Sequence, residues 1–209
     1  MKLVLFGATG ATGQHIVEQS LEAGHQVTAV ARRPEAITLR HERLTVIYGD
    51  VLEKDTLNQV ISQQDVVIST IGVTVNKPTT LYSTGITNII EGMYGATVNR
   101  LICISAAGLE VGSGVPLWQR IVIPLMLHRL FRHVYADMAR MEAVVRSSTL
   151  DWTIIRAPRL TNGPRRGKYR IALNQHLTQV GVSRADVADY IHTHLNDPAT
   201  YRMQVEIAY

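Results

Sequence analysis

Short apolar runs alternate along this chain with longer stretches of helical periodicity. The runs predicted to be β-strands are Lys2–Phe6, Gln26–Ala31, Leu44–Tyr48, Val66–Ile71, Leu101–Ser105, Trp152–Arg156 and Gln204–Ile207. Several of them lack polar alternation, which is typical of strands covered on both faces. Strands joined by crossover helices therefore predict an α/β fold of the Rossmann type, a doubly wound parallel sheet in three α/β/α layers.

The predicted helices cover Thr12–Ala23, Lys54–Ser62, Thr79–Tyr94, Arg129–Ser147 and Ser183–Leu195. In the fourth, apolar residues recur at three- and four-residue spacing and predict one core-facing stripe. Its carboxylates Asp137 and Glu142 are expected to be solvated or to form local ion pairs. The fifth helix opens with Ser183 as its expected N-cap, with Asp186 three residues later.

The length of 209 residues suits a single domain over 1–209, with substrate-facing insertions near 106–130 and 158–180. The apolar stretch Ile121–Leu127 contains Pro124 and is too short for a membrane span, so no membrane partner is expected. A single cysteine, Cys103, allows no internal disulfide and fits a reducing, cytoplasmic compartment. The chain is expected to be a soluble monomer or homodimer.

The formal charge of +4 raises the question of a nucleic-acid partner. No dense basic run supports one, because Arg32-Arg33 and Arg165-Arg166 are the only basic doublets. A modest positive balance also suits an anionic cofactor and a small planar or anionic substrate, and we favour that interpretation.

The strongest motif is Gly7-Ala8-Thr9-Gly10-Ala11-Thr12-Gly13, placed after the first predicted strand and before the first helix. Glycine here permits a tight turn, backbone approach to a diphosphate and close helix–strand packing. The amides at the helix N-terminus would then face the phosphates. The strand before the motif and the helix after it favour a dinucleotide site over an ordinary glycine turn.

Arg32 and Arg33 end the second strand, where NAD enzymes usually carry an acid that binds the ribose. An arginine there accommodates a 2′-phosphate, so the sequence predicts NADP(H); the alternative is a pair of solvated surface arginines. Asp50 is expected to accept a hydrogen bond from adenine, to cap the helix beginning near Lys54, or to do both.

Four segments carry a resemblance to a known family: Gly7–Gly13, Val30–Arg33, Gly49–Leu52, and Met141-Glu142 through Leu150–Arg156. The chain resembles the atypical short-chain dehydrogenase/reductases, in the branch of biliverdin-IXβ (flavin) reductase and NADH-flavin-reductase-like proteins. The tail from Val182 to Ala188 is also similar to that branch, so the likeness spans nearly the whole chain.

The resemblance implies a set of cofactor contacts along the strand ends. They are Gly7, Thr9, Gly10, Ala11, Thr12 and Gly13 at the diphosphate, Arg32 and Arg33 at the 2′-phosphate, Asp50 and Val51 at adenine, Thr70, Ile71 and Gly72 at the ribose, and Ser105, Ala106 and Pro158 at the nicotinamide.

The chain departs from the wider superfamily in its catalytic residues. Those enzymes pair a serine with Tyr-x-x-x-Lys, but here Tyr135 is followed four residues later by Ala139. A phenol without a neighbouring cation keeps a pKa near ~10 and is a poor base at neutral pH. Ser105 and Tyr135 therefore remain only a candidate proton-handling pair.

Hydride transfer to a planar acceptor needs little side-chain chemistry, because the cofactor supplies the hydride. The sequence thus predicts an NADPH-dependent reductase of flavins, quinones or tetrapyrrole-like acceptors, with FMN and FAD among the candidates. The alternatives are a non-catalytic NADP(H)-sensing regulator and an epimerase- or dehydratase-like enzyme. Trp118, Arg120 and His133 are candidate substrate contacts. The alternative, which the helical spacing slightly favours, is that Trp118 and its neighbours form an amphipathic segment that packs on the domain or on a second subunit. The histidine spacings predict no metal site.

Overall fold

The computed structural model describes residues 1–73, 77–109, 117–177 and 181–209, and for residues 117–130 it describes the backbone alone. Eight strands form one sheet in the order β3-β2-β1-β4-β5-β6-β10-β8, while β7 and β9 form a second, two-stranded sheet. The strands are β1 Lys2–Phe6, β2 Gln26–Ala31, β3 Leu44–Tyr48, β4 Val66–Ser69, β5 Arg100–Ala106, β6 Asp151–Ala157, β7 Arg159–Thr161, β8 Arg170–Leu173, β9 Gly181–Ser183 and β10 Met203–Ala208.

From β3 to β10 every neighbouring pair in the large sheet is parallel, and only β8 joins it antiparallel, beside β10. The chain runs outward from β1 to β3 and then returns to β4 on the other side of β1. This reversal between β1 and β4 opens a crevice at the carboxyl ends of the strands, which is where doubly wound sheets bind ligands.

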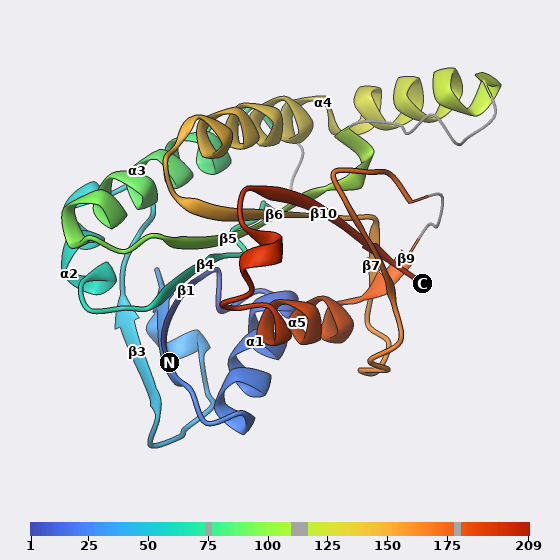
Figure 1. Cartoon of the computed structure of the whole chain (residues 1–209). Coiled ribbons are helices and arrows are strands. Elements are labelled where there is room, and N and C mark those ends of the chain that lie inside the picture. The colour runs from blue at the N-terminus through green and yellow to red at the C-terminus, as the bar shows by residue number, and fades with distance from the viewer. Residues whose placement is uncertain (74–76, 110–116, 178–180) are drawn as a thin grey trace.

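The helices are α1 Ala11–Glu22, α2 Asn58–Ile61, α3 Leu81–Ala96, α4 Leu117–Ser147 and α5 Arg184–Thr193, with short 3-10 turns η1 Pro34–Ala36, η2 Lys54–Thr56, η3 Ala107–Leu109 and η4 Pro198–Thr200. The helix expected over Lys54–Ser62 is in fact two pieces, η2 and α2. The helix expected from Arg129 begins at Leu117 and bends at Phe131, whose φ of −118° and ψ of 21° are not helical. The part of α4 before this bend projects beyond the sheet (Figure 1). No helix in the described part of the chain has the length and apolar character needed to cross a membrane.

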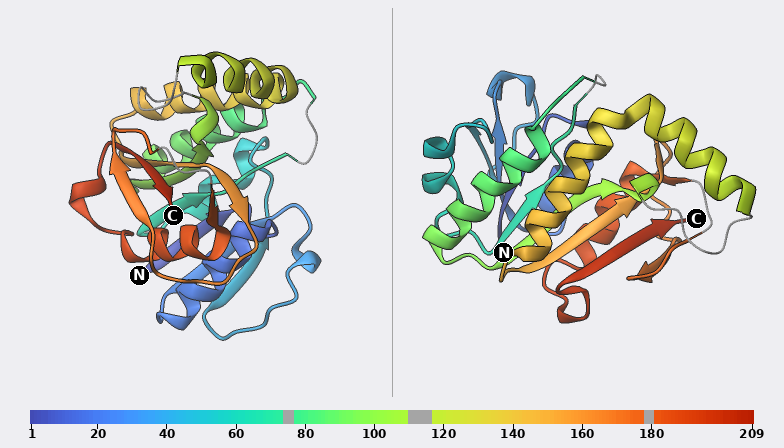
Figure 2. Two further views of the ribbon diagram at one scale, coloured as in Figure 1. Left: turned by 90° about the vertical axis from the view of Figure 1, so that its right-hand side faces the viewer. Right: turned by 90° about the horizontal axis from the view of Figure 1, so that it is seen from above.

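Two apolar layers sandwich the large sheet, which confirms the predicted three-layer α/β/α fold (Figure 2). On one face, residues of α1 and α5 such as Ile16 and Val187 pack on Leu5 and Ile155. On the other face, α2, α3 and α4 cover Phe6 and the neighbouring strands. Successive strand residues alternate between the two layers, so a run that is apolar throughout fills both of them.

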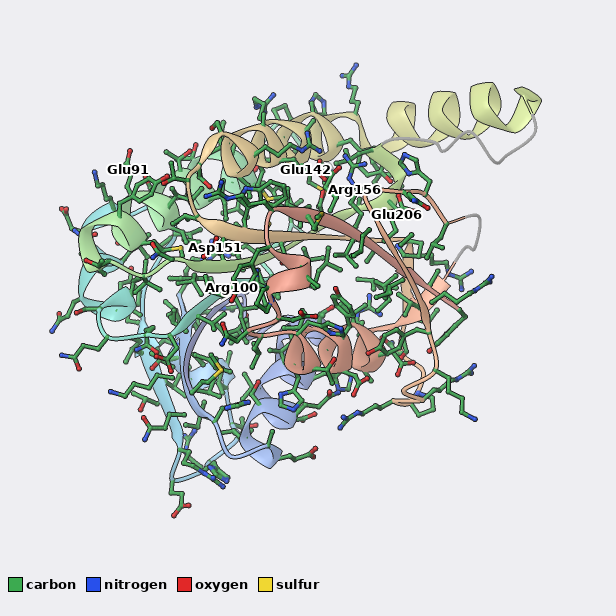
Figure 3. All side chains as sticks on the ribbon, viewed as in Figure 1. Glu91, Arg100, Glu142, Asp151, Arg156 and Glu206 are labelled. Atoms are coloured by element: carbon green, nitrogen blue, oxygen red, sulfur yellow. The ribbon has the colours of Figure 1, made fainter. Side chains whose placement is uncertain are left out.

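Buried charges inside the sandwich all have partners in the protein. Glu142 on α4 is 1% exposed and accepts from the Nε of Arg156 at 2.9 Å, so the two form a buried ion pair between α4 and β6 (Figure 3). Asp137 is fully buried as well. The expectation that these carboxylates are solvated is therefore wrong, and the alternative of local ion pairs is confirmed, because Asp137 pairs with Arg140 at 3.1 Å and Glu142 pairs with Arg146 on the same helix. Their further partners, such as Tyr82 for Asp137 and Arg156 for Glu142, lie in other elements, which local helical periodicity does not reveal.

At the amino end of the sheet, Arg100 is 5% exposed and has no carboxylate within ion-pair distance among the described residues. Its guanidinium donates instead to backbone oxygens, including those of Leu195 at 2.8 Å and Asp151 at 2.9 Å, and to the hydroxyls of Thr153 and Thr200. It also lies 4.7 Å over the ring of Tyr201. Burial lowers the pKa of Arg100 to about 10, and the group remains a cation at neutral pH.

Candidate functional site

A cleft of about 930 Å³ opens at the carboxyl ends of the parallel strands, at the β1–β4 reversal. Every residue that the resemblance assigned to the cofactor lines this one cleft. They are Gly7, Thr9, Gly10, Ala11, Thr12, Gly13, Arg32, Arg33, Asp50, Val51, Thr70, Ile71, Gly72, Ser105, Ala106 and Pro158. Residues more than 150 positions apart in the sequence are thus brought together because all of them end or follow parallel strands.

The three motif glycines serve two different purposes. Gly7 has φ +89°, and a Cβ there would lie 2.6 Å from the backbone of Thr70, while a Cβ on Gly13 would clash with the carbonyl of Gly7. These two positions require glycine for the fold itself. A Cβ on Gly10 would meet only Gly7 O, at 3.3 Å, and φ there is −76°. Gly10 is the motif glycine that the fold needs least, and its missing side chain leaves room for a ligand to approach the backbone closely.

Helix α1 begins in the cleft, because Gly10 and the first residues of the helix are among the lining residues. Gly10 is its N-cap and supplies no side-chain cap, and no acidic residue stands in the first turn. The first N–H groups of a helix have no intrahelical acceptor, and the helix dipole adds partial positive charge there. Phosphate oxygens satisfy both features, so this end of the cleft suits a diphosphate.

Thr70 fastens the glycine loop from the neighbouring strand. Its hydroxyl lies 3.2 Å from the carbonyl oxygens of both Phe6 and Gly7, and its amide donates to Phe6 O at 2.8 Å. This turn explains why β4 ends at Ser69, two residues before the predicted end at Ile71. The loop is therefore held by the protein alone.

The charged residues that line the cleft are Arg32, Arg33, Arg184 and Asp50. Both Arg32 and Arg33 are exposed at the end of β2, and the guanidinium of neither forms a hydrogen bond or ion pair with a described residue. Asp50 Oδ1 accepts from Leu52 N–H at 3.0 Å, whereas the N-cap of η2 is Glu53. The alternative role of Asp50 as a helix cap is thus wrong: its carboxylate closes the turn after β3.

Tyr82 is a cleft residue that the sequence analysis did not identify. It is 3% exposed on α3, and its hydroxyl accepts from Val73 N–H at 3.1 Å, in the loop that follows β4. Asp137 in turn accepts from the amide of Tyr82 at 2.9 Å and from the hydroxyl of Ser83. Helix α4 thereby positions α3, and α3 positions the cleft wall. No short motif marks such a residue, because its role depends on three separate segments.

The candidate pair Ser105 and Tyr135 is not joined in this structure. Ser105 is 3% exposed, and its Oγ has no hydrogen-bond partner among the described residues, although it lies in the cleft wall. Tyr135 is not among the cleft residues; its ring stacks on Phe131 with centroids 5.9 Å apart, and its hydroxyl lies near Gly108. Burial raises the pKa of Tyr135, which makes the phenol a still poorer base.

The three candidate substrate contacts are not gathered at the cleft by the described structure. The side chains of Trp118 and Arg120 lie outside the described residues. His133 is half-buried on α4, bonded to Arg132 at 3.1 Å, and does not line the cleft. Residues that do line its far end, and that the sequence analysis missed, are Met138, Leu160 and Arg184. In the described part of the chain, no three histidine, cysteine or acidic side chains gather as a metal site would require.

Comparison with known proteins agrees with this geometry. A family model described as NAD(P)H-binding matches residues 7–198, which is most of the chain. The chain belongs to this NAD(P)H-binding family. The match begins at the first glycine of the cleft loop and extends past α5, so it includes every lining residue described above.

Proteins similar to this chain include ones that are named as reductases or as reductase homologs. An isoflavone reductase homolog from Nicotiana tabacum is 35% identical over 80 residues, which is 34% of this chain and only 26% of that relative's length. ChuY, an anaerobilin reductase from Escherichia coli O157:H7, superposes with a TM-score of 0.79 at 25% identity, over 100% of this chain and 97% of that one. A wide-type short-chain dehydrogenase/reductase from Veillonella parvula, in complex with NADP, has a TM-score of 0.80 at 23% identity over 100% and 94%.

Proposed function

We propose that this protein is an NADPH-dependent reductase that transfers hydride to a flavin, a quinone or a tetrapyrrole-like acceptor. One observation carries the proposal: a single cleft joins the uncapped start of α1, the exposed Arg32 and Arg33, and the strand ends at Ser105 and Pro158. The order of these elements along the sheet matches an extended dinucleotide, from its phosphorylated adenosine end to its reactive ring.

The described residues fit such a cofactor. The start of α1 offers amides to the diphosphate, and Gly10 leaves room for close approach. Arg32 and Arg33 offer guanidinium groups that match a 2′-phosphate, and they have no competing carboxylate among the described ion pairs. The unpartnered Oγ of Ser105 supplies a hydrogen bond at the opposite end. When bound, the nicotinamide ring supplies hydride.

The chemistry left to the chain is orientation rather than proton abstraction. Tyr135 lies outside the lining residues and burial raises the pKa of its phenol, so the proposal gives it no role as the catalytic base of the wider superfamily. A planar conjugated acceptor takes up hydride without such a base, and a proton follows from water. The names of ChuY, an anaerobilin reductase, and of the tobacco isoflavone reductase homolog support this class of reaction.

Turnover with defined acceptors tests the proposal directly. Oxidation of NADPH is followed by its absorbance with FMN, with dichlorophenolindophenol as a quinone-like dye, and with biliverdin. We expect turnover with at least one of the three. Saturable NADP(H) binding without turnover on any of them would reject the reductase and favour a regulatory sensor of NADP(H).

Charge reversal at β2 tests the cofactor preference. Arg32→Asp is expected to raise the Kd for NADPH roughly 10- to 100-fold, because a charge-assisted hydrogen bond contributes about 1.5–3 kcal/mol. The Kd for NADH should change little. Arg40→Asp is the matched control, since Arg40 is exposed, donates only to nearby carbonyls and does not line the cleft. Equal losses for both nucleotides would refute the 2′-phosphate assignment.

A further inference from the structure

Arg184 is a third cation in the cleft, at a position to which no motif assigned a role. It is the first residue of α5, directly after β9, and it lines the same cleft as the glycine loop. Its neighbours at that end are Pro158 and Leu160, which follow β6. Because the sheet order runs from β3 and β2 through β1 to β6, Arg184 lies with the β6 side, while Arg32 and Arg33 end β2 on the other side.

The guanidinium of Arg184 is held in place yet left electrostatically unpaired. Its NH1 group donates to Asn162 Oδ1 at 2.6 Å and to Leu160 O at 3.3 Å. Both acceptors are neutral, and the ion pairs of the described residues include no carboxylate for Arg184. Arginine has five N–H donors, so its Nε and NH2 groups remain available.

Other arginines of the same region are neutralised by acids. Arg165 donates from Nε to Asp189 Oδ1 at 2.7 Å, and the guanidinium of Arg156 is paired with Glu142. The acid nearest to Arg184 in the sequence, Asp186, accepts instead from Tyr209 Oη, from Ser183 and from the amides of Arg166 and Gly167. The positive charge of Arg184 therefore faces the cleft without local compensation.

The surroundings of Arg184 indicate what kind of group it meets. Met138, Leu160 and Pro158 give this end of the cleft apolar walls, which suit the flat body of a conjugated acceptor. A fixed cation beside apolar walls favours a ligand that carries an acid group on an apolar frame. On the basis of the proposed reductase function, we propose that Arg184 binds an anionic group of the acceptor, a carboxylate or a phosphate, and so selects acid-bearing acceptors over neutral ones.

FMN and riboflavin separate this role from general binding, because they share one ring system and differ by the phosphate. The test compares Arg184→Gln with the unmodified protein, measuring KM for each flavin and NADPH binding by titration. The variant is expected to raise KM for FMN roughly 10- to 100-fold and to leave KM for riboflavin and the Kd for NADPH unchanged. Biliverdin and its dimethyl ester make the same comparison for carboxylates and so distinguish the two anionic groups.

Two controls keep the result specific. Arg165→Gln removes a guanidinium nearby that does not line the cleft, and it should leave the FMN-to-riboflavin ratio of KM unchanged. Arg184→Lys keeps the positive charge but lacks the planar guanidinium that can donate two parallel hydrogen bonds. It should lose less affinity for FMN than Arg184→Gln. Thermal melting of each variant confirms that it folds.

The two proposals fail in distinguishable ways. Quenching of flavin fluorescence by the NADP⁺-saturated protein measures acceptor binding even if no turnover occurs. An unchanged preference for FMN over riboflavin in Arg184→Gln would overturn the role of Arg184, and a higher Kd for NADPH in that variant would assign the cation to the cofactor diphosphate instead. Loss of the reductase function itself would show as absent turnover in the unmodified protein.

Discussion

Arginine side chains at the two ends of the parallel strands differ in how far the protein satisfies their hydrogen-bond donors. At the amino end, Arg100 is buried and donates to a ring of carbonyl and hydroxyl oxygens that the protein provides. At the carboxyl end, Arg32 and Arg33 are exposed, and Arg184 meets only two neutral acceptors. A cation whose donors are filled by the protein serves stability. A cation whose donors are left open at a cleft wall indicates a ligand.

The amino end should respond to mutation with a loss of stability and nothing else. Arg100→Met leaves several buried carbonyl oxygens without a donor, at about 1–3 kcal/mol for each group that finds no other partner. We therefore expect a fall of at least about 3 kcal/mol in the free energy of unfolding, measured by urea denaturation, with no change in the Kd for NADPH. Arg202→Met is the control, because Arg202 also donates to backbone carbonyls but is exposed, and it should lose less than about 1 kcal/mol. A higher Kd for NADPH in Arg100→Met would contradict the assignment of Arg100 to stability alone.

The glycine loop sharpens the comparison within the cleft itself. Gly10→Ala should weaken NADPH binding by about 1–2 kcal/mol, because its methyl group occupies the space of a close backbone approach, while the unfolding free energy falls by less than about 1 kcal/mol. Gly13→Ala should lose binding and stability together, since its Cβ clashes with Gly7 O. Calorimetric titration and urea denaturation of both variants provide the measurements. If Gly10→Ala binds NADPH normally, the helix start is not the diphosphate site.

The smallest expected effect concerns a histidine pair near the ends of α1 and α5. The rings of His25 and His192 lie 5.3 Å apart, and burial, the N-terminal ammonium group and His192 lower the pKa of His25. Burial and the charge of Arg165 lower the pKa of His192. Asp189 and Glu22 act in the opposite direction but do not outweigh them. Protonation therefore favours the unfolded chain, so stability is full above the usual pKa of about 6.5 and falls as the pH drops through the lower folded values.

His25→Gln should accordingly lose less unfolding free energy than the unmodified protein between neutral pH and pH ~5. Urea denaturation at several pH values gives the two profiles. NADPH affinity measured at neutral pH should be the same in both proteins, because neither histidine lines the cleft. Parallel pH profiles would show that the pair carries no linkage between protonation and folding.

Much of the fold follows from the sequence because the signals are local. The bounds of β1, β2 and β3 agree with the predicted runs, and Ser183 caps α5 as expected, accepting from Asp186 N–H. The strands β7, β8 and β9 were missed because each is only three or four residues long and is defined by its partner strand. The predicted start of α4, at Arg129, lies after its true start at Leu117. Local periodicity does not reveal a helix that continues across a bend at Phe131.

In the candidate site too, the residues with a local sequence signal were predicted and those placed by distant packing were not. The residues that the sequence assigns to the cofactor lie at strand ends and in a glycine motif, where sequence position alone dictates their place, and the structure brings them into one cleft. Tyr82 and Arg184 carry no such signature, because their positions depend on how α3 and α5 pack against the rest of the chain. Whether the lining residues make the cofactor contacts assigned to them stays a prediction for the titrations above.

The hydroxyl of Thr70 has a kinetic consequence for the glycine loop. Because it lies within hydrogen-bond distance of the carbonyls of Phe6 and Gly7 in the protein alone, the loop is held in one shape before a nucleotide arrives. A rigid receptor loses little conformational entropy on association. The observed rate of nucleotide capture should then rise in proportion to nucleotide concentration without levelling off, as expected for a one-step encounter rather than for a loop that must first reorganise.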